Sequence, residues 1–358
     1  MELFKASNQW ATRPPDERFA SLDLARDACL DYRKSAQTAT ISHDSIRVEA
    51  DGDELRLAGH TTDKMADLTS WAFGQVCNIA QAPTSYLKRI KSTLAAQCIN
   101  YGLKRNATRD RSKLLFHPRN GEGLLLRAIT STQYQRFWNH EVFERLIAMS
   151  SREPWKVPPA MGNKPSGLYA SSHDMFAFMV NDENRINDGS EGGLGRGFFL
   201  WNSEVGAKSL GGMTFLYRYV CGNHIVWGAQ KVMDFRLKHT KNIASRAAGK
   251  FRDMEVRVRQ YAESSASDLE AKIASSKTLQ IADSEEGVID ALFSKGVTSR
   301  VNARAGFKLA EKHSDVDGSP WSQWGMLQGL TRASQEVTFA DERAELDLAA
   351  AKVMEIQW

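Results

Sequence analysis

Two short apolar runs in the middle of the chain constrain its fold more than any other stretch. They are Phe198–Trp201 and Met213–Cys221, and the polar segment Asn202–Gly206 interrupts them. Each run is rich in aromatic and β-branched residues and is bounded by Gly or Asn, which is the pattern of a buried strand. We therefore expect a pair of neighbouring core strands with a polar turn at their edge.

The polar residues of this turn have two interpretations. In the first, Asn202 and its neighbours only cap the turn, as Asn and Ser commonly do. In the second, Asn202, Glu204 and the later His224 form an active site, because a carboxylate beside a buried segment is a candidate for proton transfer. Both interpretations stay open, and no catalytic residue is assigned.

Other segments extend the prediction of strands. Residues 39–60 alternate between apolar and polar side chains around Asp51-Gly52, which is a hairpin signal. The segment 181–197 is rich in Asn, Asp and Gly, so we expect a long polar loop outside the core. Alternation and short runs define these strands, without βαβ periodicity, so we predict an α+β fold. Its antiparallel or mixed sheet, with helices packed on one face, is built from residues 39–58, 124–130, 168–180 and 198–226.

The C-terminal part of the chain is expected to be helical. Apolar residues recur at steps of three and four over 241–280, which predicts one long helix or two in tandem. A single helix would be about 60 Å long, more than one compact core needs. We therefore expect a subunit contact through Phe251, Met254 and Val258. The expected parts are an N-terminal helical arm (1–38), an α+β core (39–235) and a helical C-terminal region (236–358).

Two basic stretches, 104–119 and 236–259, favour nucleic acid as the partner. Clustered like charges repel one another unless an anion lies beside them. Aromatic residues follow the first stretch, an arrangement suited to stacking on bases. Alternatively, the basic stretches are solvated faces and the aromatic residues pack into the core. The predicted nucleic-acid-binding residues are Lys104, Arg105, Arg109, Arg111, Lys113, Tyr134, Trp138, Lys238, Lys241 and Arg246.

Several segments resemble one family. The run Trp201–Leu210, followed by Phe215–His224, resembles the central signature of a phage/plasmid-like family known only as domain of unknown function 932. Leu68–Cys77, Leu126–Tyr134 and Phe235–Thr240 are similar to it as well. The resemblance implies a phage or plasmid origin, and it implies no catalytic residues.

The composition and the absence of known motifs restrict the classes of protein to which the chain can belong. The net charge of +4 permits an acidic partner without requiring one. The longest apolar runs are far shorter than a membrane span, and the four cysteines are too scattered for a disulfide framework or a zinc site. We therefore expect a soluble, cytoplasmic protein with no membrane partner. No phosphate-binding loop, metalloprotease motif or closely spaced Asp/Glu/His cluster occurs, so we expect no cofactor and no metal.

Three functions follow from these observations. The favoured one is a non-enzymatic nucleic-acid-binding protein of a phage or plasmid, with single-stranded DNA as partner. It would be a homo-oligomeric single-strand annealing or recombination accessory. The second is a protein-binding module of a mobile element that antagonises a host defence protein. The third is an enzyme of unrecognised type, against which the missing motifs count.

Overall fold

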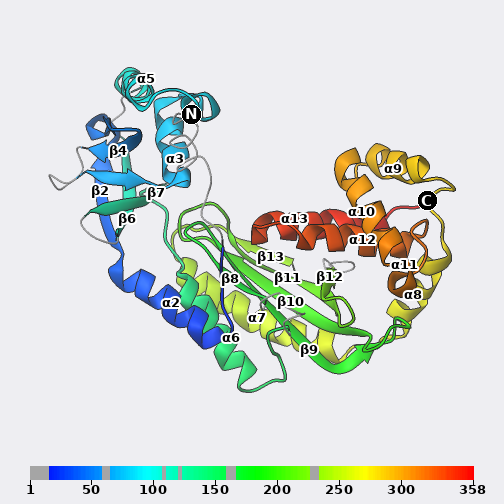
Figure 1. Cartoon of the computed structure of the whole chain (residues 1–358). Helices are drawn as coiled ribbons and strands as arrows, with labels where there is room; N and C mark the ends of the chain where they lie inside the picture. Colours follow the sequence, from blue (N-terminus) through cyan, green and yellow to red (C-terminus); the bar gives the residue numbers. More distant parts are fainter. Residues whose placement is uncertain (1–15, 59–64, 107–109, 120–122, 159–166, 226–233) are drawn as a thin grey trace.

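A computed structural model of the chain describes residues 16–58, 65–106, 110–119, 123–158, 167–225 and 234–358. Figure 1 shows two β-sheets, each with its own helices. The small sheet has six strands in the order β2-β6-β7-β5-β4-β3. The large sheet has seven, in the order β1-β8-β9-β10-β11-β12, with β13 also paired to β11.

The small sheet is antiparallel except where β5 runs parallel to β7. The predicted hairpin is confirmed, because β3 pairs with β4 around Gly52, whose positive φ of 60° suits glycine. Three helices on one face bury Phe73, Val76 and Ile99 against the sheet. The strands are β2 (Gln37–Ser42), β3 (Arg47–Asp51), β4 (Glu54–Ala58), β5 (Ala66–Leu68), β6 (Arg111–Pro118) and β7 (Leu124–Ser131). The helices are α3 (Ser70–Ala80), α4 (Thr84–Leu87) and α5 (Ser92–Arg105), and a 3-10 turn, η1, covers His43–Ser45.

The large sheet is antiparallel throughout its described pairs. The two core strands expected from the sequence are β10 and β11, which pair with each other and are buried along their whole length. Gly197 makes this close packing possible, because a Cβ there would lie 2.5 Å from the Phe215 ring. The strands are β1 (Glu17–Arg18), β8 (Leu168–Ala170), β9 (Met175–Ile186), β10 (Leu194–Asn202), β11 (Leu210–Arg218), β12 (Asn223–Ile225) and β13 (Asp234–Leu237).

Helices cover both faces of the large sheet. Successive residues of a strand point to opposite faces, so Phe198 and Leu200 pack toward one set of helices and Phe199 and Trp201 toward the other. The first set is α2 (Leu22–Ser35), α6 (Asn139–Ser150) and α7 (Ile243–Glu263). The second set is α8 (Ser267–Thr278), α9 (Glu285–Ser294), α10 (Arg300–Lys312), α11 (Ser314–Asp317), α12 (Gln323–Gln335) and α13 (Ala340–Ala351), followed by the 3-10 turn η3 (Lys352–Met354).

The α+β class and the helical C-terminal part are confirmed. The expected strands are present, but they divide between two sheets where the sequence suggested one. The expected helix is two in tandem, because residues 264–266 separate α7 from α8. The subunit contact predicted through Phe251, Met254 and Val258 is wrong, since these side chains are buried in the chain's own core beneath the large sheet.

The expected loop over 181–197 is also wrong. Strand β9 continues to Ile186 and β10 begins at Leu194, so most of the segment forms a hairpin of the large sheet. Three of its polar residues, Asn181, Asp188 and Arg196, are buried, and each has hydrogen-bond partners. Arg196 is 1% exposed and donates to the backbone oxygens of Asn184 and Ser264, both at 2.6 Å. Paired in this way, a charged group is compatible with the core.

Candidate functional site

The two sheets meet where the β8–β9 and β10–β11 turns reach β7 and α3. We call this meeting point the junction. The indole N–H of Trp71 donates to the carbonyl of Val205 at 2.9 Å. The guanidinium of Arg127 donates to the carbonyl of Ser172 at 2.8 Å. The polar turn singled out in the sequence therefore lies between the two lobes.

Glu204 is the central acidic group of the junction. It is 2% exposed, and its Oε1 accepts a hydrogen bond from the backbone N–H of Asn139 at 2.9 Å. Asn139 is the first residue of α6, where the helix dipole favours a negative charge. The Oε2 atom lies 3.3 Å from a guanidinium nitrogen of Arg127, itself 3% exposed. A buried charge needs such compensation, so Glu204 has the contacts of a structural carboxylate.

His117 completes this buried group. Its Nε2 lies 3.1 Å from Arg127, and burial together with the Arg127 charge lowers the pKa of His117 to about 3. The ring is therefore neutral at neutral pH. Because arginine only donates, Nε2 is the acceptor.

Asn202 joins the same turn to the start of α6. Its amide nitrogen donates to the carbonyl of Phe137 at 2.7 Å and to the side-chain oxygen of Asn139 at 2.8 Å. Asn202 and Glu204 thus share the role of positioning α6. The third residue of the possible active site, His224, belongs to β12, but its side chain lies outside the described residues.

A small cavity of about 120 Å³ adjoins Glu204 and Arg127. Cys29 and Tyr32 of α2 line its other side. Burial raises the pKa of the Cys29 thiol, chiefly by desolvation, which keeps it protonated and unreactive. The cavity therefore presents no activated nucleophile from this cysteine.

Part of each basic stretch comes together beside the junction. The ammonium of Lys113 donates to the carbonyl of Tyr134 at 3.2 Å. The next backbone N–H, that of Gln135, donates to the carbonyl of His239 at 3.1 Å. The guanidinium of Arg246 in turn reaches the Thr240 hydroxyl at 2.8 Å. We call the resulting group the basic surface; it consists of Arg111, Lys113, Lys238, Lys241 and Arg246.

The charges of the basic surface are not neutralised within the chain. No carboxylate in the described ranges forms an ion pair with any of its five cations. Several exposed arginines elsewhere are paired, for example Arg152 with Glu255 at 3.3 Å and Arg304 with Glu286 at 2.6 Å. The neighbouring His239 is neutral, since burial lowers its pKa to about 4. The surface is thus positive through its lysines and arginines alone.

An open groove of about 520 Å³ runs beside Arg111. Its walls carry hydroxyl and amide groups from α3, β6 and the end of β7, together with the carboxylate of Asp110. The polar residues that line it include His43, Gln75, Asn78, Thr130, Ser131 and Thr132.

The two predicted stacking aromatics are engaged with protein groups. The ring of Tyr134 stacks on His239 at 5.1 Å, and its hydroxyl donates to the carbonyl of Ser203 at 2.9 Å. The guanidinium carbon of Arg33 lies over the Trp138 ring, 4.4 Å from the ring centre. The other three predicted nucleic-acid-binding residues are not part of the basic surface. Lys104 and Arg105 are exposed in the last turn of α5, and Arg109 lies outside the described residues.

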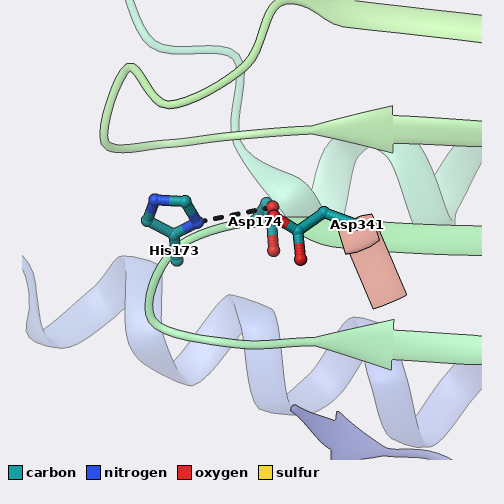
Figure 2. Close-up of side chains that lie close together, drawn as sticks. All are labelled: His173, Asp174 and Asp341. Atoms are coloured by element: carbon teal, nitrogen blue, oxygen red, sulfur yellow. Dashed lines mark ion pairs between the residues drawn. The ribbon is translucent and has the colours of Figure 1, made fainter. Parts of the chain in front are cut away.

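A cluster with metal-binding potential lies on the other side of the junction. Figure 2 shows His173 and Asp174 of the β8–β9 turn facing Asp341 of α13. The Nδ1 of His173 lies 3.4 Å from Oδ2 of Asp174. One potential ligand atom from each of the three residues lies within 4.8 Å of the others.

Sequence reasoning missed Arg127 and this cluster. Arg127 had a signal, since it is the one charge in the apolar strand Leu124–Ile129 and so required a buried partner. The cluster had no such signal in the sequence, because Asp341 is far from His173 along the chain.

Comparison with known sequences gives one result. The family model described as Domain of unknown function (DUF932) matches residues 128–350, more than half of the chain. No curated protein and no solved structure matches. Among the described residues, no helix has the length and apolar character needed to cross a bilayer. The match begins within β7 and includes β8 to β13 and most of the C-terminal helices, and the chain therefore belongs to the DUF932 family.

Proposed function

We propose that the chain is a non-enzymatic protein that binds single-stranded DNA on the basic surface. The observation that carries this proposal is the convergence of Arg111 and Lys113 with Lys238, Lys241 and Arg246 without carboxylate partners. Their mutual repulsion is relieved when phosphates lie beside them, and the counterions released from the DNA add a favourable entropy. A phage or plasmid origin and a part in strand annealing or recombination belong to the same proposal.

The groove beside Arg111 supports a single strand over a duplex. Its volume of about 520 Å³ is sufficient for a nucleotide, and Asn78, Ser131 and Thr132 offer donors and acceptors along its walls. The base edges of a duplex are already paired, whereas an unpaired base presents its full edge to such groups. Because the rings of Tyr134 and Trp138 have protein partners, we assign affinity to phosphate contacts and not to stacking.

The test compares two double variants of equal charge. Lys241→Gln/Arg246→Gln removes two cations from the basic surface. Lys308→Gln/Lys312→Gln removes two exposed lysines from α10, across the large sheet, and is the matched control. Fluorescence anisotropy with labelled single- and double-stranded oligonucleotides, repeated over a salt series, measures the affinity of each.

We expect the first variant to bind single-stranded DNA more weakly, and its log–log salt slope to fall by about 1.4, or roughly 0.7 for each lost phosphate contact. The control should match the wild type. The rate at which complementary strands anneal tests the accessory role directly. An unchanged affinity and slope in Lys241→Gln/Arg246→Gln would contradict the proposal and leave a protein partner as the better hypothesis.

A further inference from the structure

We propose that His173, Asp174 and Asp341 bind a divalent transition-metal ion. The inference goes beyond DNA binding and does not depend on it, because none of the three residues belongs to the basic surface. It rests on the geometry of the ligand atoms, on how each is held, and on the two carboxylates that the fold brings together.

The ligand atoms are close to the arrangement that one ion requires. Nitrogen and oxygen ligands lie about 2.1 Å from a bound transition metal, so two ligands of one ion are at most about 4.2 Å apart. In this cluster, one atom of each residue lies within 4.8 Å of the others. A small rotation of the side chains therefore closes the site, without movement of the backbone.

The surrounding structure holds the ligands in place. The hydroxyl of Ser171 accepts hydrogen bonds from the backbone N–H groups of His173 and Asp174, both at 3.1 Å, and so fixes the turn. The indole of Trp71 meets the His173 ring edge-on at 4.7 Å. Such contacts around the ligands orient them for binding. Asp341 comes from the first turn of α13, so the ion would join two segments that are distant in sequence.

The charge around the cluster favours a dication. Asp174 and Asp341 are brought together although the Asp174 side chain is only 1% exposed. Lys208 lies 3.8 Å from Asp341 and, at the same distance, from Glu345. A divalent ion beside Asp174 and Asp341 would offset the repulsion between their carboxylates.

The ligand set indicates the class of ion. An imidazole nitrogen with two carboxylate oxygens suits Mn²⁺, Fe²⁺ or Zn²⁺, whereas Ca²⁺ takes six to eight oxygens. Three protein ligands also leave coordination positions for water or another ligand. A groove of about 330 Å³ lined by Asp341, Lys208 and Trp201 gives an ion a route from solvent.

The experiment titrates the full chain with Mn²⁺ and with Zn²⁺ by calorimetry after treatment with a chelator. Electron paramagnetic resonance counts the bound Mn²⁺. Asp341→Asn removes a ligand and keeps its shape. Glu342→Gln, an exposed acidic residue beside it in the first turn of α13, is the matched control. Lys208→Met removes the competing ammonium.

We expect one ion per wild-type chain, at least tenfold weaker binding in Asp341→Asn, no change in Glu342→Gln and tighter binding in Lys208→Met. Circular dichroism checks that each variant folds, and His173→Gln replaces Asp341→Asn if that variant does not. Two results would overturn the proposal. One is no saturable binding of either ion by the wild type at millimolar concentration. The other is wild-type affinity in a folded ligand variant.

Discussion

Replacing Asp347 with Asn should remove a loss of stability that the wild type suffers as pH rises. Asp347 lies in α13, is 2% exposed and accepts a hydrogen bond from the hydroxyl of Ser334 in α12. Burial raises its pKa from 3.8 to about 7, although the positive charge of Arg343 and the Ser334 hydrogen bond act in the opposite direction. Asn has the same shape and keeps the acceptor, but it cannot ionise.

The sign and size of the effect follow from proton linkage. Between pH 3.8 and about 7 the folded chain holds a proton on Asp347 that the unfolded chain has released. This contribution to stability is therefore complete below pH 3.8 and is lost progressively as pH rises to about 7. Each pKa unit corresponds to about 1.4 kcal/mol, so about 3 kcal/mol should be lost between pH 5 and the upper limit of this window.

Urea unfolding of the wild type and of Asp347→Asn, each at pH 5 and pH 8, measures this loss. Other groups also change the stability with pH, and His117, whose pKa is lowered by burial, acts with the opposite sign. Their effects cancel when Asp347→Asn is compared with the wild type at each pH. We expect the advantage of the variant to increase by about 3 kcal/mol from pH 5 to pH 8. Parallel stability curves for the two chains would refute the reasoning.

Two further predictions concern buried charges. Arg218, 1% exposed, binds Asp188 at 2.7 Å and also Asp317; Arg218→Met should cost about 3–5 kcal/mol in urea unfolding, because the buried Asp188 loses its arginine and Asp317 keeps only Arg332, and a cost below that of the exposed Arg152→Met would contradict this. Glu204→Ala should lower the melting temperature more than it lowers DNA affinity, since it leaves Arg127 buried without its carboxylate; an unchanged melting temperature with lost binding would instead assign Glu204 to the binding site.

The local sequence patterns predicted the individual strands and helices better than they predicted which parts of the molecule pack against them. The runs that became β10 and β11 were recognisable because nearly every position is apolar and buried, so no long-range information was needed. The periodicity of α7 likewise identified its apolar face correctly. It did not reveal what covers that face, and the large sheet of the same chain covers it instead of a second subunit.

Buried polar residues were the least predictable part. Asp188 and Arg196 look like loop residues, because local composition does not show that Arg218 and the carbonyl of Ser264 will meet them. For the same reason the sequence pointed to Glu204 but not to its partner Arg127. Motif searches detect ligands that are close along the chain, so they could not bring Asp341 beside His173.

The route of the chain through the two sheets has a consequence for how the molecule comes apart. After β1, at the edge of the large sheet, the chain builds the whole small sheet and then returns through α6 to β8. Arg33 and Trp138, in contact at 4.4 Å, close the neck of this excursion. The lobe above the neck, which holds β2 to β7 with α3 to α5 (Figure 1), has a hydrophobic core of its own. Such a unit can open cooperatively while its two ends stay joined. Amide exchange should therefore separate the molecule into an inserted lobe and a more persistent body that includes the large sheet.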